Sequence, residues 1–169
     1  MNHSTNGPAL IKTTLLLVAL VWMGCNTPSE KPSVEPAPSE INVPFRADGQ
    51  LEISRGDVVL ASLTIEIAED DSSRTRGLMQ RDNLPDQSGM LFIFEGESQQ
   101  GFWMGNTRMA LDLIFIRSDG RVQSISKYIQ PMRTETISSV GVAQYVLEVP
   151  AGYSDTIGLV ENDLVTWSR

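Results

Sequence analysis

The sequence predicts a mainly β fold: a single-domain β-sandwich or barrel with one short helix near residues 71–79. Three observations support this class. About eight short segments show either the two-residue apolar alternation or the continuous apolar run of β-strands. Turn-forming residues separate them, and the Asp-Gly pair at 119–120 is typical of a tight hairpin turn. Only one segment has the start signals of a helix.

The strand predictions follow the chain in order. Residues 58–68 show the clearest pattern, because four apolar residues between 61 and 67 alternate with polar ones. Residues 90–94 form a continuous apolar run, which is typical of a strand buried on both faces. The other predicted strands are 51–53, 102–104, 111–116, 122–126, 144–149, 157–160 and 164–167. Residues 129–142 have weak periodicity, and we expect them to cross an end of the sheet.

The helix prediction rests on Asp70, which can cap a helix over residues 72–79. Gly77 weakens the end of this segment, so packing through Leu78 and Met79 must hold it in place. The region also carries three arginines, Arg74, Arg76 and Arg81. We interpret them as a solvated face in preference to an anion site.

The amino terminus has the features of a targeting segment. Lys12 precedes a nine-residue apolar stretch, 15–23, which is too short to span a bilayer. It leads to Gly24 and Cys25 and so resembles a bacterial lipoprotein signal, in which the Cys is acylated, for example with palmitate. Trp22 and Met23 depart from that signal, which usually has Leu and a small residue there. The alternative is an ordinary secretory signal.

These features predict three regions. Residues 1–24 are the signal peptide, residues 25–44 are the lipidated Cys25 with a Pro-rich tether, and residues 45–169 are the β-rich globular domain. Asn26 follows the Cys, whereas inner-membrane retention in Gram-negative bacteria uses Asp there. We therefore expect a cell-envelope protein, anchored in the membrane through Cys25 at the periplasmic face of the outer membrane.

Composition excludes several classes of function. The net charge is −8 at pH 7, and nucleic-acid phosphates need a basic surface, so nucleic acid is an unfavourable partner. The chain has one Cys, Cys25, and one His, His3, and the latter lies in the predicted signal. The globular domain therefore has no disulfide and no thiol or imidazole for catalysis or metal binding, and we expect neither cofactor nor metal.

The densest mixture of aromatic, sulfur and polar groups lies at residues 101–116. Two apolar runs flank a polar segment there. The candidate ligand-binding residues are Trp103, Asn106, Thr107, Asp112 and, from a later strand, Glu148. A buried carboxylate is costly, so each acid must find partners or stay protonated. Asp112 could accept hydrogen bonds from backbone amides, Thr107 or an Arg, and Glu148 could face solvent or pair with an Arg.

Several short motifs in order resemble the family called domain of unknown function 192. They are 76–79 (Arg-Gly-Leu-Met), 89–92 (Gly-Met-Leu-Phe), 102–104 (Phe-Trp-Met), 106–107 (Asn-Thr), 111–112 (Leu-Asp), Phe115, 145–148 (Tyr-Val-Leu-Glu) and 150–152 (Pro-Ala-Gly). The resemblance covers about residues 60–167 and implies a compact, mainly β, jelly-roll-like single domain, often secreted or lipid-anchored. It implies no reaction. Gly105 departs from the family's usual Lys or Arg, and Asn162 from its usual Gly.

Four functions remain open. The favoured one is non-catalytic binding of a small polar or carbohydrate-like ligand, with Trp103 stacking on it and Asn106, Thr107 and Asp112 bonding its hydroxyls. A second is hydrolysis by paired carboxylates, Asp112 and Glu148. A third is soft-metal binding by methionines 79, 90, 104 and 109, although core packing explains these better. The fourth is an envelope accessory protein, monomeric itself, that binds a protein partner.

Overall fold

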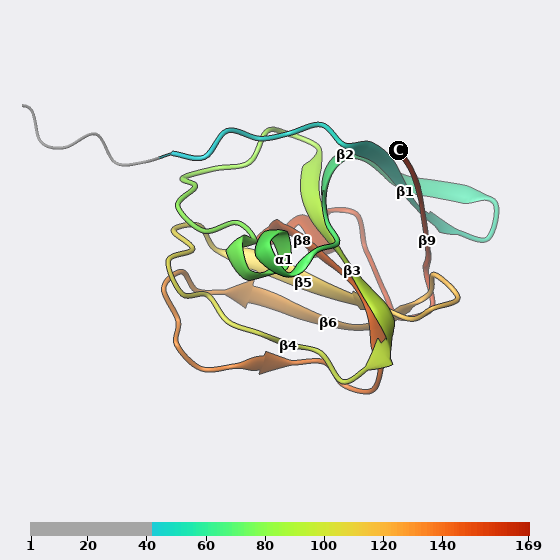
Figure 1. Ribbon diagram of the computed structural model, residues 1–169. Helices are drawn as coiled ribbons and strands as arrows, with labels where there is room; N and C mark the ends of the chain where they lie inside the picture. Colours follow the sequence, from blue (N-terminus) through green and yellow to red (C-terminus); the bar gives the residue numbers. More distant parts are fainter. Residues whose placement is uncertain (1–41) are drawn as a thin grey trace, which may run out of the picture. The chain divides into compact units, whose positions relative to one another are not determined.

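A mixed seven-stranded sheet organises residues 42–169, the part of the chain that the computed structural model describes (Figure 1). Its strand order is β6-β5-β8-β3-β2-β1-β9, and a second, small sheet pairs β4 with β7. The strands are β1 (Gly49–Arg55), β2 (Val58–Ala68), β3 (Ser88–Ser98), β4 (Gly101–Phe102), β5 (Leu111–Ile116), β6 (Val122–Ile129), β7 (Ile137–Ser138), β8 (Ala143–Pro150) and β9 (Leu164–Ser168). The helices are α1 (Asp71–Arg76) and α2 (Tyr153–Thr156). The predicted mainly β class is confirmed.

The large sheet curls but does not close into a barrel. Its neighbouring strands are antiparallel except β2 and β3, which are parallel. The two edge strands, β6 and β9, approach at an isolated bridge between Arg121 and Leu164. Three backbone hydrogen bonds join the segments there: Val165 N donates to Gly120 O at 2.8 Å, Val122 N to Asp163 O at 2.9 Å, and Asn162 N to Val122 O at 2.8 Å. The architecture is therefore sandwich-like, with apolar side chains on both faces of one curled sheet.

Each face of the sheet carries its own core. Along β3, Leu91 points into one core, while Met90 and Phe92 point into the other. All three are buried, so the expectation of a strand buried on both faces is confirmed for this part of β3. The first core includes Leu51, Ile53, Leu63, Ile65, Ile114, Leu147 and Val149. The second lies under α1 and β4 and includes Leu78, Met104, Leu111, Leu113, Phe115 and Val146.

Helix α1 starts as predicted and ends earlier. The Asp70 side chain accepts from Ser73 N at 2.9 Å, and the Ser73 hydroxyl accepts from Asp70 N at 3.2 Å, which forms a capping box. Gly77 ends the helix with φ 47°, a conformation that glycine adopts most readily. Leu78 then enters the second core at 1% exposure, so packing holds this short helix against the sheet.

The predicted strand at 157–160 is wrong. The chain instead forms α2, which sequence reasoning did not predict, and then turns at Gly158, where φ is 64°. The cause is tertiary: the buried Asp112 carboxylate accepts from Gly152 N and Ser154 N and so binds the first turn of α2. Within the weakly periodic segment 129–142, the short strand β7 was also missed, because its partner β4 lies far earlier in the sequence (Ile137 pairs with Phe102, 35 residues away).

The predicted signal peptide, Cys25 and most of the predicted tether lie outside the described residues. Between residues 42 and 169, no helix is both long and apolar enough to cross a membrane.

Candidate ligand-binding site

Three of the five predicted site residues, Trp103, Thr107 and Glu148, line one cavity of about 370 Å³. Volumes of this order are typical of small-molecule sites. The cavity lies between α1 with the residues that follow it and β4, and strands β3 and β8 form its floor. The residues that approach it are therefore distant in sequence and are brought together only by the sheet order.

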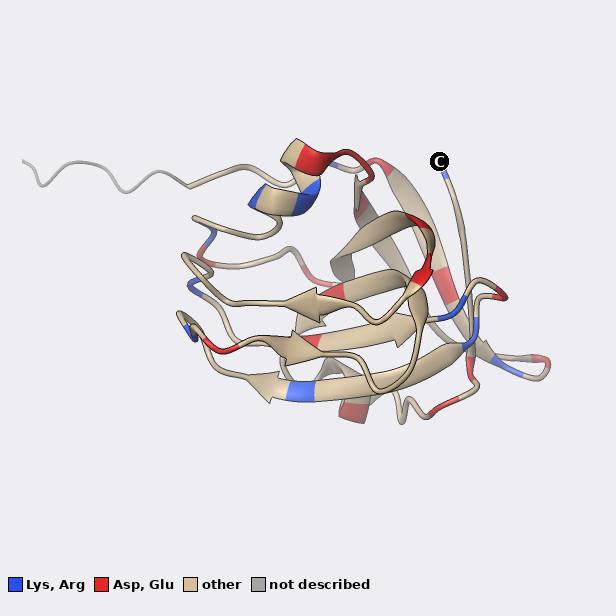
Figure 2. Cartoon of the chain, turned by 60° about the horizontal axis from the view of Figure 1, so that its bottom comes forward, with Lys and Arg blue, Asp and Glu red and all other residues tan. Residues whose placement is uncertain are grey.

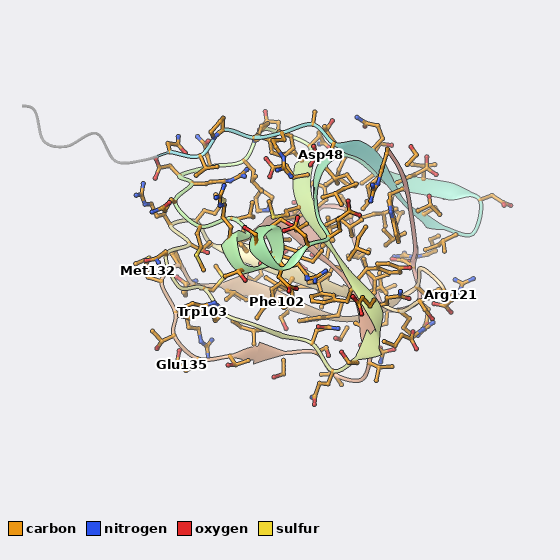
Figure 3. The ribbon with its side chains drawn as sticks, in the orientation of Figure 1. Asp48, Phe102, Trp103, Arg121, Met132 and Glu135 are labelled. Atoms are coloured by element: carbon orange, nitrogen blue, oxygen red, sulfur yellow. The ribbon has the colours of Figure 1, made fainter. Side chains whose placement is uncertain are left out.

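Aromatic rings form much of the cavity wall. Phe92 and Phe94 come from β3, and Phe102 packs edge-on against both, with ring centroids 5.0 and 6.2 Å away. Figure 3 shows Phe102 beneath α1 and Trp103 farther out toward the edge of the molecule. Such edge-to-face contacts stabilise the wall beyond simple burial. Phe92 and Phe94 were not predicted as site residues, because a continuous apolar run in a strand looks the same whether its side chains line a cavity or fill the core.

Glu148 is the unusual group of this cavity. It lies opposite Met90 on β3 and Leu113 on β5, so its side chain faces the second core. It is 5% exposed, and within residues 42–169 its carboxyl group has neither a hydrogen bond nor an ion pair. Burial raises the pKa of Glu148 from 4.5 to about 8, because desolvation disfavours the charged form. The expectation that it faces solvent or pairs with an Arg is wrong.

Asp112 lies elsewhere. Its register partner on β8 is Val149, which belongs to the first core, so its side chain points to the opposite face of the sheet from Glu148. It is fully buried and accepts three backbone hydrogen bonds, from Tyr128 N at 2.8 Å, Gly152 N at 3.1 Å and Ser154 N at 3.1 Å. The predicted backbone-amide partners are confirmed, but Thr107 is not among them. The hypothesis of an Asp112–Glu148 catalytic pair gains no geometric support, because the two side chains point to opposite faces of the sheet.

Asn106 lies next to the cavity rather than in it. Together with Met79 and Gln80 it lines a neighbouring, more open hollow. Its φ of 58° and the hydrogen bond from Gln80 N to its carbonyl oxygen, 2.9 Å, assign it to the turn that follows β4. Asparagine tolerates this left-handed conformation better than most residues do, so a structural role explains its place.

Both departures from the family pattern are accommodated locally. The Trp103 ring lies across Gly105: a Cβ atom added there would come within 2.5 Å of the ring. Trp103 itself is 54% exposed, so an indole covers the position where the family usually has a cation. Asn162, where a Gly is usual, has φ 69°, which asparagine adopts at little cost.

The three arginines near α1 have different environments (Figure 2 shows both signs of charge on this helix). Arg81 is buried and donates twice to the Glu66 carboxylate, at 2.8 Å each. Arg74 donates to Asp71 at 2.7 Å and to Ile93 O at 2.9 Å. The interpretation as a solvated face is therefore wrong for Arg81 and incomplete for Arg74.

Arg76 is the exception among them. It is exposed, lines the cavity, and has no hydrogen bond or ion pair within the described part of the chain. Its place on the helix could be predicted from the sequence. No local pattern shows that Arg74 and Arg81 form ion pairs while Arg76 does not within the described residues.

The methionine hypothesis gains no geometric support. Met90 and Met104 are buried in the second core at 4% and 1% exposure, where they pack against apolar side chains. Met79 lines the cavity, and Met109 packs against the second core from its edge. Among residues 42–169, no group of three or more His, Cys, Asp or Glu side chains could hold a metal ion.

Two solved structures resemble this chain. The first, from Sinorhizobium meliloti 1021 and named a candidate transcription regulator, is 32% identical with a TM-score of 0.67; the match covers 70% of this chain and 92% of that one. The second is a protein of unknown function from Novosphingobium aromaticivorans DSM 12444. It is 29% identical with a TM-score of 0.66, and the match covers 70% of this chain and 84% of that one. No curated protein matches.

The family comparison covers nearly all of the described chain. The profile of the DUF192 family, described as an uncharacterized ACR, matches residues 47–167. This range holds both cores and every residue that lines the cavity. The chain therefore belongs to the DUF192 family.

Proposed function

We propose that this protein binds a small polar molecule, carbohydrate-like ligands included, in the cavity between α1 and β4, without catalysing a reaction. The observation that carries the proposal is Glu148. A carboxyl group that is 5% exposed and has no partner within residues 42–169 is costly, and it lines a cavity of ligand size. A ligand that bonds this group recovers part of that cost.

The surrounding wall supports the same function. Aromatic rings offer apolar contact, while the Thr107 hydroxyl, also without a hydrogen bond in the described chain, offers a second polar contact. An apolar wall with few polar groups is the usual composition of a small-molecule site. Within residues 42–169, the carboxylates nearest to Glu148 in the fold are already paired or point away from it. Glu66 is bound to Arg81, Asp71 is paired with Arg74, and Asp112 points to the other face of the sheet.

The name of the Sinorhizobium relative raises regulation as another function. A regulator that contacts DNA needs a positive surface for the phosphates, and the net charge of −8 opposes this. We therefore favour ligand binding. We also propose, from the amino-terminal sequence, that lipidated Cys25 anchors the protein in the outer membrane.

The test uses the purified mature protein, residues 25–169, with 5-fluorotryptophan at its two Trp positions, Trp103 and Trp167. Fluorine NMR then reports each ring separately, and the variants Trp103→Phe and Trp167→Phe assign the signals. Envelope saccharides and small organic compounds are titrated in turn. We expect a binder to shift the Trp103 signal and to leave Trp167, which packs on Tyr145 in the first core, unchanged.

A matched pair of variants checks the location. Thr75 is exposed and lines the cavity, so Thr75→Phe should obstruct it and weaken binding. Thr134 is exposed and does not line it, so Thr134→Phe should leave the affinity unchanged. A binder that is insensitive to Thr75→Phe, or a full screen in which the Trp103 signal never moves, would contradict the proposed function.

A further inference from the structure

The charges around the cavity define which ligands fit it, provided that the proposed function holds. Three charged side chains besides Glu148 line it: Asp71, Arg74 and Arg76. Asp71 and Arg74 neutralise each other in an ion pair of 2.7 Å. Arg74 is further held by Ile93 O and lies over the Phe94 ring, with its guanidinium carbon 5.5 Å from the centroid. One cation of the lining, Arg76, has no hydrogen bond or ion pair within residues 42–169.

Among the residues that the structure describes, the other elements packed around Glu148 add no unpaired charge. Its register neighbours are Met90 on β3 and Leu113 on β5, and β4 contributes Phe102. Glu66 faces the same side from β2, one strand beyond Met90, but Arg81 holds both of its carboxylate oxygens. At neutral pH, burial keeps Glu148 protonated, since its pKa is raised to about 8. The cavity then presents a hydrogen-bond donor at its floor and a positive charge from Arg76.

We propose that the ligand is a small organic acid with a flat apolar body. Its anionic group pairs with Arg76, an oxygen at its other end accepts a hydrogen bond from the Glu148 carboxyl group, and its body lies against Phe102 and Trp103. Arginine binds carboxylates and related oxyanions in a two-pronged geometry that favours this pairing. No step of this binding forms or breaks a covalent bond.

An amine is the main competing ligand class, because a buried acid among aromatic rings can also receive a cation. It fits the observations less well. An amine would approach two arginines, one of which already occupies the Phe94 ring, and it would require Glu148 to ionise. The two classes predict opposite responses to pH. Affinity for the acid falls as the pH rises through about 8, whereas affinity for the amine rises over the same range.

Three probes with one body separate the classes. They are para-hydroxyphenylacetate, para-hydroxyphenylethanol and para-hydroxyphenylethylamine, which differ only in the group at one end: a carboxylate, a hydroxyl or an ammonium group. Titration of the same labelled mature protein at pH 6.5, followed by the Trp103 fluorine signal, should give the tightest binding for the acid, by about fivefold to tenfold over the alcohol. Arg76→Ala should remove this preference. Arg133→Ala, which alters an exposed arginine paired with Glu135, should preserve it.

The pH series completes the test. Affinity for the acid should fall between pH 6.5 and pH 9, and Glu148→Gln, which keeps a donor but does not ionise, should flatten that decline. Tighter binding of the amine or alcohol, or a preference for the acid that survives Arg76→Ala, overturns the proposal but leaves ligand binding in the cavity standing. If none of the probes shifts the Trp103 signal, this proposal fails, while the wider compound screen decides the proposed function separately.

Discussion

Asp112 on β5 and Glu148 on β8 lie on neighbouring strands but one position out of register, so their side chains point to opposite faces of the sheet. Asp112 is fully bonded by backbone amides, whereas Glu148 has no partner within the described residues. Two acids that look equivalent in sequence therefore have different environments. Asp112 accepts three backbone hydrogen bonds, and Glu148 lines the cavity between α1 and β4.

Removal of Asp112 should destabilise the protein. Asp112→Ala leaves three buried amide donors without an acceptor, and we expect the free energy of unfolding to fall by about 2–5 kcal/mol. Urea unfolding measures this. Asp57→Ala, at an exposed turn, is the control and should change stability by less than about 0.5 kcal/mol. Equal effects of the two substitutions would show that Asp112 has no structural role.

Glu148 should make the folded protein less stable as the pH rises, whereas an acid held in a salt bridge makes it less stable as the pH falls. Between pH 4.5 and about 8 the unfolded chain releases this proton while the folded chain retains it. Stability therefore falls as the pH rises through that window, by about 1.4 kcal/mol for each unit by which the two pKa values differ. Denaturant unfolding at several pH values should show this decline in the wild type and a smaller decline in Glu148→Gln. Parallel curves would mean that Glu148 ionises normally in the fold.

Substitutions of Glu66 and Arg81, which form a buried ion pair, should have non-additive effects on the free energy of unfolding. Arg81→Met alone leaves Glu66 charged and buried, and we expect a loss of about 3–5 kcal/mol in the free energy of unfolding. The double variant Glu66→Leu with Arg81→Met removes both charges and should recover most of that loss. A double-mutant cycle in urea measures the coupling. Additive losses would indicate that the two side chains are stabilised independently.

A side chain at position 105 should displace the Trp103 ring. Gly105→Ala adds a Cβ atom where the ring now lies, so the indole must swing outward. We expect greater quenching of Trp103 fluorescence by acrylamide, measured against a Trp167→Phe background, with a stability change below about 1 kcal/mol because an exposed side chain can move. Gly96→Ala is the control, because no atom lies near its added Cβ. Unchanged quenching would show that the ring does not rest on Gly105.

Cys25 should decide membrane attachment. If Cys25 is acylated as the amino-terminal sequence predicts, Cys25→Ala will move the protein from the membrane fraction to the soluble periplasmic fraction, or leave it unprocessed. Immunoblots of fractionated cells, with mass spectrometry of the processed amino terminus, measure this. Ser29→Ala, four residues further along, is the control and should stay with the membrane. Equal fractionation of wild type and Cys25→Ala, with both proteins processed and neither acylated in the mass spectra, would support the alternative of an ordinary secretory signal.

Much of the fold could be predicted because its signals are local. The alternation within β2, the continuous apolar runs of β3 and β5, and the Asp70 cap each lie within one element, and each element formed. The failures have one common cause. Residues 157–160 look like a strand, but the chain there continues from a helical turn held by Asp112, 40 residues or more away in sequence.

The sequence alone determined the mainly β class and the family resemblance, because apolar periodicity and motif order need no knowledge of long-range contacts. It also marked 101–116 and Glu148 as candidate site residues. Only the tertiary structure decided which of them share a cavity. The register of β5 against β8 separates Asp112 from Glu148, and the docking of α1 leaves Arg76 without a partner in the described chain. Both outcomes depend on side-chain direction and on contacts between distant segments, which a local pattern does not encode.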